Sequence, residues 1–138
     1  TSGQGYWNNT SPTSSVFTVG SDNQVNGSGR SYLAYLFAAD TEDLIKCDEY
    51  IGNGGTQTIN CGFQPQFVLI RALAAGSYDW VLFDSARTGS KYVRPNNTYA
   101  ESNHAGFAFA SNGFTLSNSV GTTNGSGKGY AYMAIAAA

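Results

Sequence analysis

Short apolar stretches separated by turn-forming residues run along most of this chain. Residues 67–73 form the most apolar stretch, and Pro65 stands just before it, where a missing backbone N–H costs little. Residues 79–84 follow a Gly-Ser turn and are expected to pair antiparallel with them. No twelve-residue window has the apolar spacing and end signals of a helix. The other expected strands are 16–19, 32–39, a hairpin over 44–61, 106–110, 113–117 and 129–135.

About eight to ten strands in one chain of this size predict an all-β fold, specifically an antiparallel β-sandwich. The strand expected at 32–39 is apolar on both faces. Leu33, Tyr35 and Phe37 lie on one face, and the other face has Tyr32, Ala34 and Leu36. A strand that is apolar on both sides is typical of the middle of a sheet. We therefore expect residues 32–39 to form a central strand.

One signature occurs twice in the chain. Residues 26–39 match residues 124–137 at seven of fourteen positions, and the basic residue keeps its sign as Arg30 and Lys128. Upstream, the stretch beginning at Phe17 matches one later in the chain after a one-residue shift. These matches predict a repeat of about a hundred residues, an arrangement common in serial domains of fibres and surface proteins.

The duplication also predicts the domain limits. Residues 41–138 would form one complete sandwich unit, and residues 1–40 the C-terminal part of a preceding repeat or an N-terminal extension. The apolar strands expected in 1–40 need cover, because unpaired apolar strands aggregate. They would pack either on the main unit or on a neighbouring chain.

The two cysteines flank a turn. The sequence Asn53-Gly-Gly reads as a hairpin tip, and Cys47 and Cys61 lie equally far from its centre. A cross-strand disulfide is then geometrically possible. The alternative is that both are small buried thiols.

Composition narrows the class of function. Charged residues make up only 12% of the chain and the net charge is -2, so no basic patch is available to neutralise nucleic-acid phosphates. The apolar C-terminal stretch is far shorter than the ~20 residues that span a bilayer, so we expect no membrane insertion. Aromatic residues reach 14%, which suits an all-β fold with polar loops.

Catalytic patterns find little support, and we predict no enzyme, no catalytic residue, no cofactor and no metal site. The chain has one histidine, His104, in a polar stretch that predicts a surface position, and no Gly-x-Ser-x-Gly elbow. The Gly-rich stretch 125–129 lacks the spacing and the Ser or Thr of a phosphate loop, so we interpret it as a turn opening a strand. Glycoside hydrolysis needs two facing carboxyl groups, and the candidates Asp79, Asp84 and Glu101 suit turn and rim roles better.

Residues 85–105 form a long stretch with few apolar positions, and such loops are more often functional than idle. Sugar sites combine aromatic faces with amide and guanidinium groups that bind hydroxyls. Such side chains are concentrated here, with a further exposed aromatic near the N-terminus. The candidate receptor-binding residues are Arg87, Lys91, Tyr92, Arg94, Asn96, Asn97, Tyr99, His104 and Trp7.

Several further stretches of the chain are informative when they are taken together. They are Tyr6-Trp-Asn-Asn-Thr-Ser-Pro-Thr-Ser-Ser-Val-Phe-Thr-Val-Gly20, Val25-Asn-Gly-Ser-Gly29, Tyr32-Leu-Ala-Tyr-Leu-Phe-Ala38, Lys46-Cys47, Tyr50-Ile-Gly-Asn-Gly54, Gly62-Phe-Gln-Pro-Gln-Phe-Val-Leu-Ile70, Asp79-Trp-Val-Leu-Phe-Asp84, Asn112-Gly-Phe114, Asn124-Gly-Ser-Gly127 and Tyr130-Ala-Tyr-Met-Ala134. Together they resemble a recurrent module of bacteriophage tail-fibre and virion structural proteins. The resemblance covers nearly the whole chain except residues 86–104.

The resemblance implies a virion protein made in the bacterial cytoplasm and exposed outside the host cell, in the distal receptor-binding part of a trimeric tail fibre. Combined with the loop, it predicts attachment to a bacterial surface polysaccharide, with avidity from several copies. Two alternatives stay open at this point. One is a polysaccharide depolymerase with a site between subunits, and the other is a purely structural fibre spacer.

Overall fold

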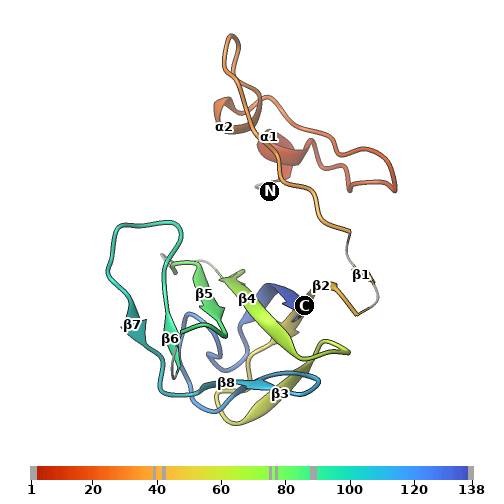
Figure 1. Cartoon of the computed structure of the whole chain (residues 1–138). Helices are drawn as coiled ribbons and strands as arrows, with labels where there is room; N and C mark the ends of the chain where they lie inside the picture. The colour runs from red at the N-terminus through yellow and green to blue at the C-terminus, as the bar shows by residue number, and fades with distance from the viewer. Residues whose placement is uncertain are drawn as a thin grey trace. The chain divides into compact units, whose positions relative to one another are not determined.

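The computed structural model of the chain describes residues 3–38, 40–41, 43–74, 76, 78–87 and 90–136. The chain divides into two compact units, Thr1–Leu36 and Phe37–Ala138 (Figure 1). This division lies close to the boundary that the duplication predicts at residue 40.

The second unit is built from antiparallel strands. A five-stranded sheet has the order β1 (Asp40–Thr41), β2 (Ile45–Ile51), β10 (Gly129–Ala136), β4 (Pro65–Ala72) and β5 (Val81–Asp84). A three-stranded sheet has the order β3 (Gln57–Asn60), β9 (Gly113–Leu116) and β8 (Phe107–Ala110), and a short pair joins β6 (Lys91–Tyr92) to β7 (Ser102–Asn103). The all-β prediction is confirmed.

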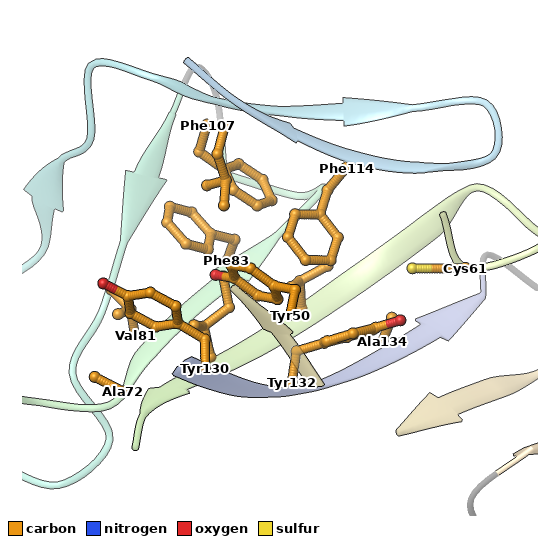
Figure 2. Packing of buried hydrophobic residues seen from close by; sticks show 13 residues of the cluster. Tyr50, Cys61, Ala72, Val81, Phe83, Phe107, Phe114, Tyr130, Tyr132 and Ala134 are labelled. Carbon is orange, nitrogen blue, oxygen red and sulfur yellow. The ribbon is translucent and has the colours of Figure 1, made fainter. Parts of the chain in front are cut away.

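Alternation along the central strands places every second side chain in the core. On β10, Tyr130, Tyr132 and Ala134 are buried, and the buried residues of the two larger sheets form one cluster (Figure 2). Aromatic rings fill much of it, and those of Phe83 and Phe107 stack with centroids 3.7 Å apart. Each such ring contributes about 1.5–3 kcal/mol by leaving water.

Most of the strands expected in the second unit are confirmed. The strand expected at 67–73 appears as β4, although it begins earlier than predicted, at Pro65, and β5 pairs antiparallel with it as expected. The strands expected at 106–110, 113–117 and 129–135 appear as β8, β9 and β10. The glycine-rich turn before β10 also leads directly into that strand, as expected.

The predicted hairpin over residues 44–61 is wrong. A turn does occur around Asn53, but β2 on one side of it pairs with β10, whereas β3 on the other side pairs with β9. Cys47 consequently lies opposite Met133, and Cys61 follows the strand of another sheet. The geometric argument for a cross-strand disulfide fails, and both side chains are thiols.

The first unit differs from the prediction in two ways. It contains two short helices, α1 (Gly3–Trp7) and α2 (Asn23–Asn26), each too short to show helical periodicity. Residues 16–19 and 32–38 form no strand, and the expected central strand is instead exposed. Apolar alternation signals a strand only where neighbouring strands exist, and no described strand pairs with these residues. Ala39, the last residue of that expected strand, lies outside the described residues.

Candidate functional site

The stretch between β5 and β8 contains a strand pair among its described residues. β6 and β7 pair within it, and Val93 extends the order by bridging to Leu82 of β5. The Val93 amide donates to the Leu82 carbonyl at 3.1 Å, and the Leu82 amide donates back at 2.9 Å. The edge strand of the five-stranded sheet therefore anchors this stretch.

A tight turn then presents the polar residues. The Asn97 amide donates to the Arg94 carbonyl at 3.2 Å, with Pro95 at the position of a turn that proline favours. The Asn97 side-chain oxygen accepts the Tyr99 amide at 2.9 Å. Asn96 fastens the turn to the segment before β5, because its side-chain oxygen accepts a backbone amide there at 2.8 Å.

These contacts assemble a surface that we call the aromatic platform, made of Asp79, Trp80, Arg94, Asn96 and Tyr99. The Trp80 amide is the donor to Asn96, whose side-chain nitrogen donates to Asp79 Oδ1 at 3.0 Å. The Arg94 guanidinium lies 5.5 Å from the centre of the Tyr99 ring, and its Nε lies 3.5 Å from Asp79 Oδ2. Tyr99 is 69% exposed and Trp80 is 40% exposed, so both rings are available to a ligand.

Tyr92 is partly buried, and it contacts Arg94 of the platform instead of forming one of its exposed rings. Its ring centre lies 4.7 Å from the Arg94 guanidinium carbon, and its hydroxyl accepts a hydrogen bond from Arg94. The ring also contacts the buried Phe83 with centroids 5.8 Å apart. Arg94 is thus held by a cation–π contact and by charge, which fixes the guanidinium beside Tyr99.

Two of the predicted basic residues are committed to an ion-pair cluster of Asp84, Arg87, Lys91 and Glu101. Arg87 pairs with Asp84 and, through Nε, with Glu101 at 2.9 Å, and Lys91 pairs with Glu101 at 2.9 Å. The hydrogen bond from Lys91, reinforced by Arg87, holds the pKa of Glu101 below its usual range. Two cations and two anions balance here, so the cluster fixes the loop and offers no spare charge to a ligand.

His104 is not a surface residue, so its predicted surface position is wrong, whereas its part in receptor binding stays a prediction. It is 4% exposed, and its Nε2 lies 2.9 Å from the Thr123 hydroxyl, which is also buried. Burial lowers the pKa of His104, so the ring is neutral near pH 7. The surface position was predicted from the polar residues around His104. In the structure the Ser90 carbonyl accepts the His104 amide, and the His104 side chain is buried.

Trp7 belongs to the first unit, whereas every platform residue belongs to the second. It is half exposed and lines an open pocket of about 360 Å³ together with neighbouring residues of the same segment. The prediction that it is exposed is confirmed, whereas its part in binding stays a prediction.

Trp80 is the platform residue that the sequence reasoning missed, because it was placed in the strand expected at 79–84 rather than in the loop. A usable signal was present. Val81 and Phe83 are buried, so alternation along β5 directs Trp80 and Leu82 to the opposite face. The Arg71 guanidinium from the same face of β4 lies 6.0 Å from the centre of the Trp80 ring.

The three candidate carboxylates, Asp79, Asp84 and Glu101, are each bonded to other side chains of the loop region. Asp79 bonds to Asn96 and Arg94, and Glu101 is kept ionised by Lys91 and Arg87. A glycosidase acid needs the opposite environment, one that raises a carboxyl pKa. Among the described residues, no cluster of three or more His, Cys, Asp or Glu side chains could hold a metal ion, and no helix is long and apolar enough to cross a membrane.

Fold and site define an all-β protein in which residues just before β5 and residues between β6 and β7 form an aromatic and polar platform. The chain belongs to the family described as "Domain of unknown function (DUF7483)", which matches residues 1–138 and therefore includes both units. No curated protein and no solved structure matches the chain.

Proposed function

We propose that the chain is an attachment module that binds the sugars of a bacterial surface polysaccharide through the aromatic platform. The observation that carries the proposal is the exposure of two rings, Tyr99 just after the turn at residues 94–97 and Trp80 just before β5, with Asn96 bonded to the Trp80 amide and Arg94 beside the Tyr99 ring. Sugar rings have apolar C–H faces that stack on aromatic rings, while amide, carboxylate and guanidinium groups bind their hydroxyls. The platform combines all of these groups, and its bonds fix most of them in advance.

The prior order of these polar side chains favours binding. The Asn96 side chain and the Asp79–Arg94 pair are already bonded, so a ligand need not immobilise them. Ordering a flexible side chain on binding costs about 0.5–1.5 kcal/mol, which is avoided here. An uncharged glycan suits the site, because the cations of the ion-pair cluster are balanced and the net charge of the chain is -2.

The resemblance to phage tail-fibre modules supplies the proposed setting. We propose that the two larger sheets form a β-sandwich at the distal end of a trimeric virion fibre. Several copies on one fibre would raise avidity by about 10²–10⁴ over a single site. This setting also explains how a platform of two rings could hold a virus on a cell.

The test is retention of the full chain on immobilised bacterial lipopolysaccharide and capsular polysaccharide, with the polymer length followed in parallel. Tyr99→Ala and Trp80→Ala should each weaken retention about tenfold, which corresponds to about 1.4 kcal/mol. Tyr35→Ala is the matched control, because Tyr35 is an equally exposed tyrosine outside the platform.

Equal retention of Tyr99→Ala and Tyr35→Ala would remove the platform from the binding site. Retention of no polysaccharide at all, with an intact fold, would favour a structural spacer. Shortened polymers would show a depolymerase, and the carboxylates of the loop would then be replaced in turn.

A further inference from the structure

The duplicated signature forms the same turn in both units. The Tyr32 hydroxyl accepts the Gly27 amide at 2.6 Å, and the Tyr130 hydroxyl accepts the Gly125 amide at 2.7 Å. Each hydroxyl then donates to the carbonyl oxygen four residues ahead of its glycine, at 2.7 Å and 2.9 Å. Two bonds of one tyrosine are thus reproduced with partners displaced by the same 98 positions.

The asparagine that opens the signature follows the same rule. Asn26 Nδ2 donates to the Gly20 carbonyl at 3.0 Å, and Asn124 Nδ2 donates to the Asn118 carbonyl at 3.0 Å. The backbone amides of the two asparagines also donate to the carbonyl four residues earlier, at 2.8 Å and 2.7 Å. Residues 20–32 are therefore a structural copy of the segment that leads into β10.

The two copies differ in the segment after the turn. β10 lies between β2 and β4 and is paired along its length on both sides. Residues 32–38 have no paired strand among the described residues, and Leu33, Tyr35 and Leu36 are 76%, 77% and 73% exposed. By equivalence with β10, this segment has the sequence position of a central strand, but among the described residues neither neighbouring strand is present.

The number of strand positions in the sheet indicates which partner would pair with residues 32–38. Each chain offers one position between β2 and β4, and its own β10 fills it. A second copy of the chain therefore cannot supply both neighbours without expelling its own strand. We infer that residues 32–38 are the last strand of another unit of this fold, and that they insert between strands of the β2 and β4 type contributed by that unit. Strand insertion of this kind gains main-chain hydrogen bonds and buries alternate side chains.

The sequence offset allows the missing strands to be added to the full chain. A second copy of residues 41–98, placed directly ahead of Thr1, carries strands of the β2 and β4 type in the spacing found in the second unit. Amide exchange in residues 32–38 should then slow by about 100-fold or more relative to the unextended chain. The matched control carries Val68→Asp and Ile70→Asp in the added copy only, because these two side chains of β4 are fully buried. It should leave residues 32–38 unprotected.

A second measurement detects docking even where it is only partly populated. In β10, Met133 lies opposite Leu69, and Tyr35 occupies the position equivalent to Met133. Because Cys47 also lies opposite Met133, the added copy carries Cys47→Ser, and Tyr35→Cys should then form a disulfide with its Leu69→Cys. The out-of-register pair of Tyr35→Cys with Phe67→Cys should not, and mass spectrometry distinguishes the two.

The inference would be overturned if residues 32–38 exchanged equally fast with the unchanged added copy and with the control copy, and no in-register disulfide formed. Protection of residues 32–38 in the unextended chain that rises with protein concentration would also overturn it, in favour of a second copy as the partner. Exchange in β10 of the second unit serves as the internal reference for an intact fold.

Discussion

Asn124 offers the sharpest test of how the second unit is held together. Its side chain is fully buried and makes four hydrogen bonds. The oxygen accepts the Asn53 amide at 3.0 Å and Gln57 Nε2 at 2.6 Å, and the nitrogen donates to the carbonyls of Gly55 and Asn118 at 2.7 Å and 3.0 Å. This one amide therefore ties the turn between β2 and β3 to the turn before β10.

Asn124→Ala should cost about 3–5 kcal/mol of unfolding free energy. Each lost bond contributes roughly 1 kcal/mol net, and buried partners left unsatisfied add about 1–3 kcal/mol. The change is a large share of the ~5–15 kcal/mol that stabilises a domain. Asn26→Ala is the matched control, since Asn26 is exposed and its side chain makes one such bond, so about 1 kcal/mol or less is expected.

Urea unfolding followed by tryptophan fluorescence measures both variants. The chain has two tryptophans, one in each unit, so Trp80 reports on the second unit and Trp7 on the first. With a slope of about 1–3 kcal/mol per molar urea, Asn124→Ala should lower the midpoint of the second unit by at least about 1 M. A loss below about 1.5 kcal/mol, or one equal to that of Asn26→Ala, would refute the reasoning.

Three further predictions concern stability and reactivity. Burial lowers the pKa of His104 from its usual 6.5, so the unfolded chain binds this proton more readily and stability falls as the pH drops below 6.5; the urea midpoint should decline between pH 7 and pH 5, and His104→Gln should remove that part of the slope. Burial raises the pKa of Cys61 to about 11, so iodoacetamide at pH 8 should modify it about 100-fold faster in urea than in buffer. Gly113 has a φ of +153°, and a Cβ there would lie 1.9 Å from the Ile59 carbonyl oxygen, so Gly113→Ala should cost more than about 3 kcal/mol in thermal melts. Gly62→Ala, at a φ of +87° with nothing within 4 Å of the added atom, should cost only about 1–2 kcal/mol.

Apolar alternation predicted the strands whose partners lie in the same unit. β10 carries a buried residue at every second position, and β4 does so from Val68 to Ala72. Each of these strands is flanked by a strand on both edges, and one face of the sheet is covered by the core. Residues 32–38 carry an equally strong pattern and form no strand. Apolar alternation indicates that a segment would be buried between neighbouring strands. Only the structure shows whether such strands are present.

The failed hairpin has a different cause. The turn at Asn53 was correctly predicted from its glycines, since local turn chemistry depends on nearby residues. Which strands pair on either side depends on Asn124, some seventy positions away, and on the buried faces of β9 and β10. Sequence spacing alone carries no record of such a contact.

The sequence predicted which residue types lie in the candidate site, but not which of these residues bind one another. Arg87 and Lys91 looked available for a ligand, yet Glu101 binds both of them. Arg94 lies in the same stretch and does reach the exposed Tyr99 ring. Charge pairing within a loop depends on how it folds back, which β6 and β7 decide here and which no local pattern encodes.

The two copies of the signature separate what a motif encodes from what its surroundings add. Tyr32 and Tyr130 make the same two bonds to their own turns, although only Tyr130 is packed in a core. The turn therefore forms from contacts within about ten residues, and it does not need a sheet to hold it. Asn26 keeps only the local side-chain bond of Asn124, so the three remaining bonds of Asn124 measure what a complete unit contributes. The Asn26 side chain has the same donors and acceptor and could make three such bonds as well. This is what we expect of a segment that belongs to a complete unit of its own.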